Sequence, residues 1–252
     1  MTLHPLAEQF AGVSVAYERG RPEYPPAVVG ALAAELGLRA GATVLDLAAG
    51  TGKLTRTLLQ AGFDVVAVEP QAELRAILSA HVGSERVREG LAEAIPLPDA
   101  SVDAVTVASA FHWFDQPVAL AEIHRVLRPQ GGLAVVSPGP DWSGASWAHE
   151  VGSLLAGLRP EHPGADGPPW QDAVRAAGGW TVPREVQVTS WHAADPDRIV
   201  DYLESISWVA ALPAAERTGA LARVRELIAD GETPDQLPVH VMLGLTNVVP
   251  RP

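Results

Sequence analysis

The chain has 252 residues, of which 47% are hydrophobic and 19% charged, and its mean hydropathy is +0.10. This composition is typical of a globular protein with a full core, organised as one α/β domain or as one such domain with an insertion. The lack of cysteine excludes disulfides, zinc–thiolate sites and thiol catalysis. The formal net charge of −12 disfavours nucleic acid and anionic lipid as partners, because an acidic surface repels phosphate.

Two further features bear on where the protein works. No apolar run approaches the ~18 residues of a membrane helix. Residues 1–5 (MTLHP) lack the basic and apolar regions of a signal peptide. We therefore expect a cytoplasmic protein that does not act at a membrane.

The first predicted element is a helix over residues 28–36, whose apolar residues share one face and which Gly37 is placed to end. Before it, residues 17–25 (YERGRPEYP) set two tyrosines and two prolines around a pair of arginines, which predicts an ordered non-helical arm. This arm is either a surface segment with solvated arginines or a flap over a bound ligand, with Arg21 near a carboxylate of that ligand.

The pattern around which the chain is organised is a strand, a turn of small residues and a helix. An apolar run at 44–47 predicts a short buried strand, and residues 48–52 (AAGTG) carry no side chain larger than threonine. Apolar residues at helical spacing follow over 54–61, before Gly62. Such a unit brings backbone N–H groups and a helix N-terminus up to a ligand, and Asp46 adds a carboxylate beside the turn.

The spacing separates three ligand classes that use such a turn. A phosphate-binding P-loop requires Gly-x4-Gly-Lys-Ser/Thr, but here Lys53 is followed by Leu54 and the first glycine position holds Leu47. A dinucleotide fingerprint requires a third glycine where this chain has Thr55. The turn that binds S-adenosylmethionine, acidic-x-Gly-x-Gly-x-Gly, matches with alanine at its first glycine. The matching positions are Asp46, Ala48, Gly50 and Gly52.

A second buried strand is predicted over residues 64–69 (DVVAVE), and Pro70 after it suits the first turn of a helix. Glu69 lies 19 positions after Gly50, close to the separation at which an acidic residue accepts hydrogen bonds from ribose hydroxyls. A shorter third strand is expected over 86–90, then a loop over 91–99.

A fourth strand is expected over residues 101–107, and residues 108–115 (ASAFHWFD) lie at its carboxyl end, where open α/β sheets bind their ligands. Asp115 and Pro117 mark the start of an amphipathic helix, and a fifth strand follows over 131–136. Strands that alternate with helices predict a parallel sheet covered on both faces.

The last third of the chain carries weaker signals. A stretch rich in proline and glycine spans residues 137–169. A strand is predicted over 185–191, and a helix that starts at Asp195 follows it. A second amphipathic helix over 214–228 and a final strand over 239–248 complete the chain.

Taken together, these motifs resemble the class I S-adenosylmethionine-dependent methyltransferases of type 11, in the small-molecule branch that includes trans-aconitate and ubiquinone/menaquinone-pathway methyltransferases. The arm at 17–25 and the phrase His112-Trp113-Phe114 resemble the trans-aconitate-like subgroup in particular. The other matching segments are residues 44–55, 69–70, 90–103 and 125–132.

The resemblance implies a Rossmann-like, doubly wound α/β fold with a seven-stranded, mostly parallel sheet, an antiparallel last strand and a helical lid insertion. It divides the chain into four parts. These are an N-terminal helical arm or flap (1–40), a cofactor-binding core (41–137), an acceptor-side lid (138–182) and the C-terminal part of the core (183–252).

Carried over to this sequence, the family's cofactor site comprises Tyr17, Arg21, Asp46, Ala48, Gly50, Gly52, Glu69, Pro70, Ala92, Glu93, Ala110 and Phe111. The acceptor would meet His112, Trp113, Trp142, Trp147 and Trp208, although the tryptophans after residue 140 also fit packing roles in a small helical layer. The chain departs from the family twice. Ala48 replaces the usual glycine, and Leu91 replaces a polar residue near the adenine, which leaves adenine selection to the backbone around Ala92 and to Glu93.

The expected activity is transfer of a methyl group from S-adenosylmethionine to a small-molecule acceptor, on a carboxylate or hydroxyl oxygen, by in-line displacement. His112 is the candidate general base because imidazole titrates near neutrality, but it also suits a wall residue, and a carboxylate acceptor needs no base. The histidines show no metal-ligand spacing, so no metal is expected. A monomer or homodimer fits equally well.

Two other function classes fit less well. One is a module that binds S-adenosylmethionine without methyl transfer and serves in regulation or assembly. The other is a nicotinamide-dependent oxidoreductase, which Thr55 disfavours because it occupies the third glycine position of the dinucleotide fingerprint.

Overall fold

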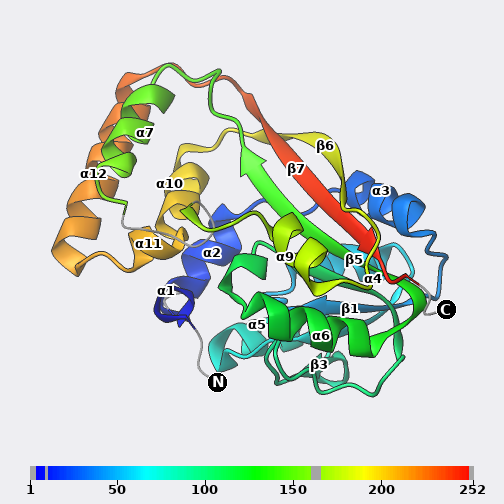
Figure 1. The fold of residues 1–252 in the computed structure, drawn as a ribbon. Coiled ribbons are helices and arrows are strands. Elements are labelled where there is room, and N and C mark those ends of the chain that lie inside the picture. The colour runs from blue at the N-terminus through cyan, green and yellow to red at the C-terminus, as the bar shows by residue number, and fades with distance from the viewer. Residues whose placement is uncertain (1–3, 9–10, 160–165, 250–252) are drawn as a thin grey trace. The chain divides into compact units, whose positions relative to one another are not determined.

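The computed structural model describes residues 4–8, 11–159 and 166–249 (Figure 1). Residues 1–3 and 9–10 of the predicted N-terminal arm (1–40), residues 160–165 of the predicted lid (138–182) and residues 250–252 lie outside that description. The chain divides into two compact units. Unit 1 comprises Met1–Pro22, Gly139–Asp166 and Thr189–His240, and unit 2 comprises Glu23–Pro138, Gly167–Val188 and Val241–Pro252.

The described strands form a seven-stranded sheet with the order β3-β2-β1-β4-β5-β7-β6. Its first five strands are parallel, and two registers define its centre: Leu45 of β1 lies opposite Val66 of β2 and Val105 of β4. The bounds of these strands are β1 Thr43–Leu47, β2 Asp64–Val68, β3 Val87–Arg88, β4 Val102–Ala108 and β5 Leu127–Pro140. The strand order reverses between β1 and β4, which is where doubly wound sheets bind ligands.

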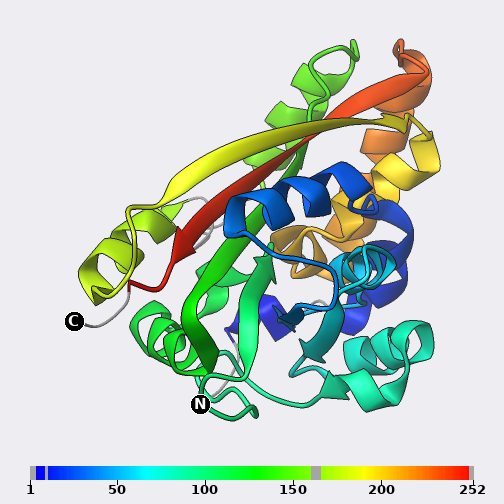
Figure 2. The same cartoon turned by 90° about the vertical axis from the view of Figure 1, so that its right-hand side faces the viewer.

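The last strand is antiparallel, as the family resemblance implies. β7 (Gln236–Asn247) lies between β5 and β6 (Arg184–Ala193) (Figure 2). The Val248 amide donates to the Gly131 carbonyl at 2.9 Å, and the Asp141 amide donates to the Pro238 carbonyl at 2.8 Å. Because the numbers fall along β7 as they rise along β5, the two strands run in opposite directions.

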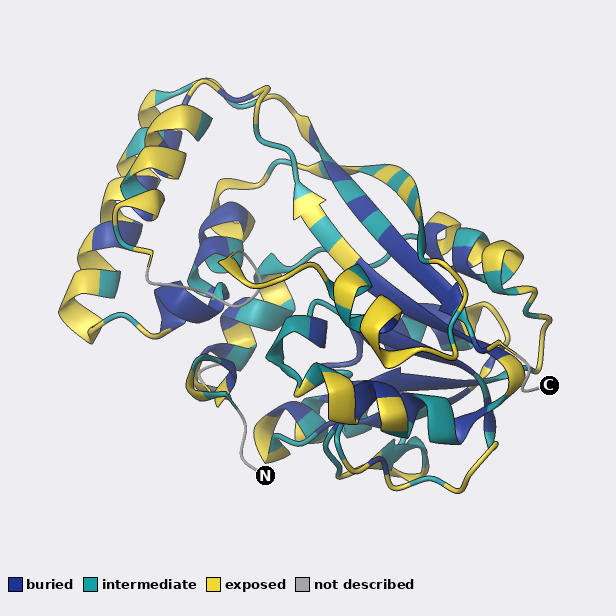
Figure 3. Ribbon diagram, in the orientation of Figure 1, coloured by how far each residue is buried: buried dark blue, intermediate teal, exposed yellow. Residues whose placement is uncertain are grey.

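Both faces of the sheet in unit 2 are covered by helices. One face packs on α6 (Gln116–Val126), which buries Leu120 and Ile123 against Val105 of β4 and Leu133 of β5. The alternate residues of the same strands point to the other face, where Leu36 of α3 lies against Gly132 of β5. As a result β1 and β4 are buried almost throughout (Figure 3).

The other helices of unit 2 begin and end at residues that their sequences favour. Pro26 starts α3 (Pro26–Leu36), and Gly37 ends it in the left-handed conformation, as predicted. Asp115 caps α6, its carboxylate accepting from the Val118 amide at 3.4 Å. The remaining helices of this unit are α4 Lys53–Gln60, α5 Ala72–Val82 and α9 Trp170–Ala177, and α9 lies beside α6 (Figure 1).

Unit 1 has a helical core of its own. Helix α10 (Pro196–Glu204) packs on α2 (Ser14–Gly20) and on α12 (Ala214–Asp230), and α12 packs on α7 (Ala148–Ala156). Trp147 and Leu203 are among the side chains buried at its centre. The short helices α1 (Pro5–Glu8) and α11 (Ser207–Ala210) complete the described helices of this unit. No helix in the described ranges is both long and apolar enough to cross a membrane.

Three predicted elements differ from the structure. Residues 17–20 of the arm are helical, not irregular, because α2 continues to Gly20; the restriction that Pro22 places on Arg21 ends the helix only there. The third strand has two residues instead of five, since Arg86 belongs to a 3-10 turn. The fifth strand extends beyond residues 131–136 at both ends, although its prolines and glycines weaken the sequence signal.

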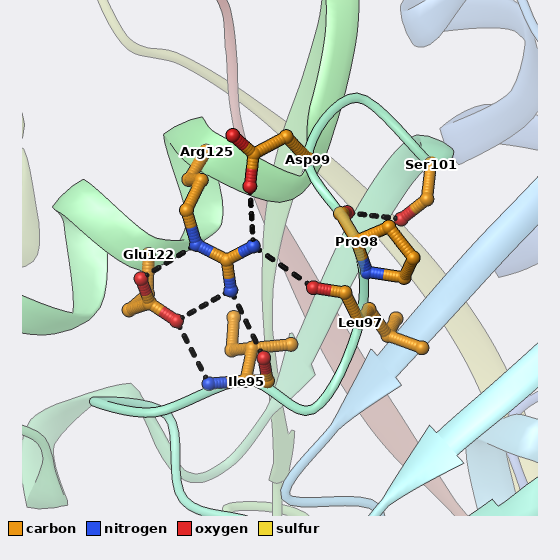
Figure 4. A network of polar contacts seen from close by, with 7 residues as sticks. All are labelled: Ile95, Leu97, Pro98, Asp99, Ser101, Glu122 and Arg125. Atoms are coloured by element: carbon orange, nitrogen blue, oxygen red, sulfur yellow. Dashed lines mark hydrogen bonds and ion pairs between the residues drawn. The ribbon is translucent and has the colours of Figure 1, made fainter.

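One arginine fixes the loop that follows β3 (Figure 4). The Arg125 guanidinium donates to both carboxylate oxygens of Glu122, each at 2.7 Å, and to the Asp99 carboxylate at 2.8 Å. It also donates to the carbonyls of Leu97 at 2.8 Å and Ile95 at 2.9 Å. A single planar side chain on α6 therefore holds a loop with little regular structure at several points.

The contact between Trp170 and β7 gives a test of the packing in unit 2. A Cβ at Gly244 would lie 2.3 Å from the Trp170 ring, which is itself packed edge-on against Phe111 with centroids 6.3 Å apart. We expect Gly244→Ala to lower stability by about 1–3 kcal/mol through overpacking. Gly30→Ala is the matched control, because no atom beyond its own helix backbone lies within 4 Å of a Cβ at that position, and it should raise stability by about 0.5–1 kcal/mol. Thermal unfolding measures both, and equal effects would contradict the packing described.

The Arg125 cluster predicts a cost for a substitution that keeps the charge. Arg125→Lys loses the planar fork that reaches two carboxylates and two carbonyls, so we expect a loss of about 1–3 kcal/mol. The substitution should accelerate amide hydrogen exchange more in residues 91–99 than elsewhere in the chain. Arg223→Lys, whose exposed side chain pairs with Glu226 alone among the described contacts, should stay within about 0.5 kcal/mol of the parent protein. Unchanged exchange in the loop would remove Arg125 as its anchor.

Candidate functional site

The predicted residues of unit 2 come from the carboxyl ends of adjacent parallel strands. Residues 48–52 follow β1, Glu69 follows β2, and residues 109–113 follow β4. Because β1 lies between β2 and β4 in register, these three segments leave the sheet at one edge. Ala48, Ala92, Phe111 and Trp113 also belong to one apolar cluster.

The turn after β1 is built from residues in the left-handed conformation. The φ angles are 56° at Ala48, 59° at Gly50 and 88° at Gly52. Glycine adopts such angles without strain, whereas alanine pays roughly 1–2 kcal/mol. From the sequence, the replacement of glycine by Ala48 adds a methyl group that a slightly wider turn would accept. The structure shows a further difference, the left-handed backbone angle of Ala48, which glycine would adopt without strain.

Asp46 is buried and held by two hydroxyl groups. Its carboxylate accepts from Thr55 Oγ1 at 2.6 Å and from Thr106 Oγ1 at 3.0 Å. Burial raises the pKa of Asp46 to about 6, although both hydroxyls act in the opposite direction. Sequence reasoning used Thr55 only to reject a dinucleotide turn and missed both threonines as partners. The signal for them is the general rule that a buried carboxylate needs donors.

Glu69 connects the end of β2 to the glycine turn. It is 3% exposed, and its carboxylate accepts from the Gly50 amide and the Gln71 amide, each at 2.9 Å. Burial raises the pKa of Glu69 to about 7, against the lowering effect of these amides. Since the folded pKa lies above the ordinary value of 4.5, this group favours the folded state most at low pH, and that contribution is lost as the pH rises through about 7.

Two residues that sequence reasoning did not select also belong to this edge. Arg75 on α5 donates to the backbone carbonyl of Glu69 at 3.1 Å and to the Glu89 carboxylate at 2.8 Å, which fixes the corner at Pro70. The Thr51 hydroxyl is buried in the turn and has no hydrogen-bond partner among the described residues. A buried hydroxyl without a partner is rare and points to a ligand or an ordered water.

The segment after β4 repeats the geometry of the turn after β1. Ser109 takes a left-handed φ of 55°, directly after the strand, and a 3-10 turn follows over Phe111–Trp113. Ala110 and Phe111 are buried, whereas His112 and Trp113 are partly exposed, with their ring centroids 4.4 Å apart. A polar ring and an indole are therefore presented next to the apolar cluster.

The loop after β3 supplies the two residues expected near the adenine. Ala92 is buried, and the Glu93 carboxylate accepts from the Asp115 amide at 2.8 Å. Glu93 thus ties the loop to the start of α6, at the end opposite to the Arg125 contacts on that helix. Pro70 is partly exposed directly after Glu69.

The remaining predicted residues belong to unit 1 and are described within it. The Arg21 guanidinium lies over the Tyr17 ring at 5.1 Å and the Tyr202 ring at 4.9 Å, and it donates to Ser205 Oγ at 3.0 Å. Trp147 and Trp208 are buried in the core of this unit, whereas Trp142 is partly exposed. Contact of these residues with cofactor or acceptor stays a prediction.

The sequence comparisons agree on the chemistry. A family model described as a methyltransferase domain matches residues 45–135, which lie in unit 2. An uncharacterized methyltransferase of Mycobacterium tuberculosis is 41% identical over 224 residues, which cover 89% of this chain and 87% of the relative. Two shorter matches cover 37% of this chain and 38% of the relative. They are a malonyl-[acyl-carrier protein] O-methyltransferase of Pectobacterium atrosepticum (39% identical) and a ubiquinone/menaquinone biosynthesis C-methyltransferase of Rubrivivax gelatinosus (42%).

A solved structure from Anabaena variabilis, described as a candidate methyltransferase from an antibiotic biosynthesis pathway, has the same fold. It matches with a TM-score of 0.61 and 20% identity, over 92% of this chain and 99% of that one. The family model, the long match to the mycobacterial relative and the strand order agree with the motif around Gly50. The chain belongs to the S-adenosylmethionine-dependent methyltransferases and carries their type 11 domain.

Proposed function

We propose that the chain transfers the methyl group of S-adenosylmethionine to a small-molecule acceptor, on a carboxylate or hydroxyl oxygen. The observation that carries the proposal is the buried Glu69 carboxylate, hydrogen-bonded to the Gly50 amide at 2.9 Å. It joins the tip of β2 to the turn after β1, which are the two segments that hold the sugar and the amino-acid portion of the cofactor in this reading.

The residues at this edge fit the cofactor. Each oxygen of Glu69 accepts one backbone N–H and keeps a second lone pair, which suits two ribose hydroxyls. The Thr51 hydroxyl, without a partner among the described residues, suits a polar group of the ligand. Ala92 and Glu93 are the proposed contacts of the adenine, and the turn at Ala48, Gly50 and Gly52 brings main chain rather than side chain to the ligand.

When bound, the cofactor supplies an electrophilic methyl group on a sulfonium. The residues of the chain supply position and exclusion of water. Holding the acceptor atom in line with the methyl group accounts for roughly 7–11 kcal/mol of the barrier in well-oriented reactions. Phe111, His112 and Trp113 are the proposed wall next to the reacting atoms, and a hydroxyl acceptor passes its proton to His112.

The relatives support a small acceptor without choosing its atom. One shorter match is named as an O-methyltransferase and the other as a C-methyltransferase, and both matches cover less than half of this chain. We propose oxygen as the acceptor atom because a carboxylate needs no base and a hydroxyl loses one proton, which the His112 imidazole can accept. The formal net charge of −12 argues against nucleic-acid acceptors.

Glu69 makes cofactor binding depend on pH. Burial raises the pKa of Glu69 to about 7, so its carboxyl group is protonated below that pH. Ribose hydroxyls donate more strongly to an ionised carboxylate, so the cofactor binds better once this proton is lost. We expect the affinity for S-adenosylhomocysteine to rise with pH by up to about tenfold per unit below pH 7, and to level off above it. Calorimetry at several pH values measures this.

Glu69→Gln is the matched variant for that titration. It should bind about 10-fold or more weakly above pH 7 and lose the pH dependence centred on about 7, because the amide cannot ionise. A folded parent protein that does not bind S-adenosylhomocysteine at any pH would refute the proposed cofactor site. Full affinity in Glu69→Gln would remove Glu69 from it.

His112→Gln separates the two oxygen acceptors. With a hydroxyl acceptor we expect kcat to fall by about 10²–10⁴, and with a carboxylate acceptor by less than tenfold, since a carboxylate has no proton to lose. Cofactor affinity should be unchanged. His124→Gln, on α6 with its ring against Trp180, is the control and should keep full activity. Binding without turnover across a panel of alcohols and acids would instead support a module that has lost methyl transfer.

A further inference from the structure

Unit 1 contains a pocket whose lining includes none of the residues assigned to the cofactor turn. It is open to solvent, and about 500 Å³ of space, including the solvent at its mouth, lies between its walls. Its lining comes from the end of α2, the segment after β5, the junction of β6 with α10, and β7. All of the lining residues belong to unit 1.

The interior of the pocket is apolar. Ile199 of α10 and Leu237 and Val239 of β7 line it, and each is less than a tenth exposed. Two aromatic side chains add flat surfaces. Trp142 and Tyr202 lie edge to face, with ring centroids 5.6 Å apart and planes at 83°. Such a lining favours the apolar or aromatic body of a ligand.

One cationic side chain at the pocket has donors to spare. Arg198 is exposed and lines the pocket, and its Nε donates to the Arg19 carbonyl at 3.3 Å. Neither terminal nitrogen of this guanidinium has a partner in the part of the chain that the structure describes. The neighbouring arginines differ: Arg19 is paired with Asp201 at 3.0 Å, and Arg21 is bonded to Ser205. The planar fork of Arg198 is therefore available for a carboxylate.

His192 completes the polar side of the pocket. One ring nitrogen contacts Ser190 Oγ at 2.9 Å. Burial, together with the charge of Arg198, lowers the pKa of His192, so the imidazole is neutral at physiological pH and offers a hydrogen bond without a second charge. The pocket thus presents a single unpaired cation, one neutral polar ring and an apolar interior, which matches a ligand with one negative charge.

We propose that this pocket in unit 1 binds a small apolar monocarboxylate, with its body against Trp142 and Tyr202 and its carboxylate on Arg198. The proposal concerns binding and does not depend on the assignment of the cofactor site. Such an acid is either the acceptor of the methyl group or an effector that is not methylated. Both would carry the same apolar body and carboxylate.

The test uses phenylacetate as the probe and phenylacetamide, its uncharged isostere, as the comparison, on the full chain without cofactor. Chemical shifts of ¹⁵N-labelled tryptophan side chains report binding, and Trp142→Phe identifies the Trp142 signal. We expect phenylacetate to shift that signal in a saturable way and to bind about 10-fold more tightly than phenylacetamide, as expected for a hydrogen-bonded charge pair.

Variants of Arg198 decide the role of the charge. Arg198→Met should reduce the affinity for phenylacetate to that for phenylacetamide, and Arg198→Lys should bind with intermediate affinity. Arg225→Met, at an exposed position of α12 outside the pocket lining, should bind like the parent protein. Absence of a shift at Trp142, or equal weakening of acid and amide in Arg198→Met, would overturn the proposal.

A second arm identifies the source of the ligand. The bound acid is incubated with S-adenosylmethionine, and the methyl ester is sought by mass spectrometry. An ester that depends on Arg198 supports the pocket as the acceptor site, and binding without an ester supports it as an effector site. Failure of the cofactor proposal leaves the phenylacetate titration unchanged, so the two proposals fail independently.

Discussion

The site in unit 2 depends on one hydrogen bond between segments 19 residues apart, from the Gly50 amide to the Glu69 carboxylate. β1 and β2 are held in register by their ladder, which ends at Leu47 and Val68, and one more backbone bond follows it, from the Ala49 amide to the Val68 carbonyl at 3.1 Å. Beyond that bond, the Glu69 carboxylate joins the two functional segments. Because it is buried, its bond to the amide is not weakened by competition with water, and its second lone pairs remain for a ligand. A substitution at Glu69 would therefore alter the turn itself as well as the proposed contact with the cofactor.

Strain at this edge is placed where the ligand is expected. Ala48 and Ser109 each leave the sheet in the left-handed conformation, one residue past the ends of neighbouring strands. Non-glycine residues adopt such angles at a cost and cluster at functional sites. The Thr51 hydroxyl, in the turn after β1, is buried without a hydrogen-bond partner among the described residues, which is a second cost to the stability of the free chain. Both costs are consistent with a turn shaped for a ligand rather than for the stability of the free chain.

Much of this could be predicted from the sequence, because local signals dominate in unit 2. The periodicity of residues 44–61 and the acid 19 positions after Gly50 indicate the strand, the turn and its partner without tertiary information. The bond of Asp46 to Thr106 could not be predicted, since it needs the register of β1 with β4, and its bond to Thr55 needs the placement of α4 after the turn. The burial of Trp147 and Trp208 could not be predicted either, because their cluster draws side chains from distant helices such as α7, α10 and α12, and no local pattern encodes that packing.

The Arg125 anchor gives the two sides of the proposed cofactor site different responses to acid. Its guanidinium stays charged at any physiological pH, and its hydrogen bonds hold the pKa of Glu122 below the ordinary value, so the contacts in this cluster persist until that low pKa is reached. Glu69 takes up its proton near neutrality. At mildly acidic pH the loop over residues 91–99 would keep its shape, while Glu69 would already be protonated and a weaker acceptor for the proposed ribose contact. Under this proposed assignment the protein would release the cofactor without unfolding and bind it again when the pH rises.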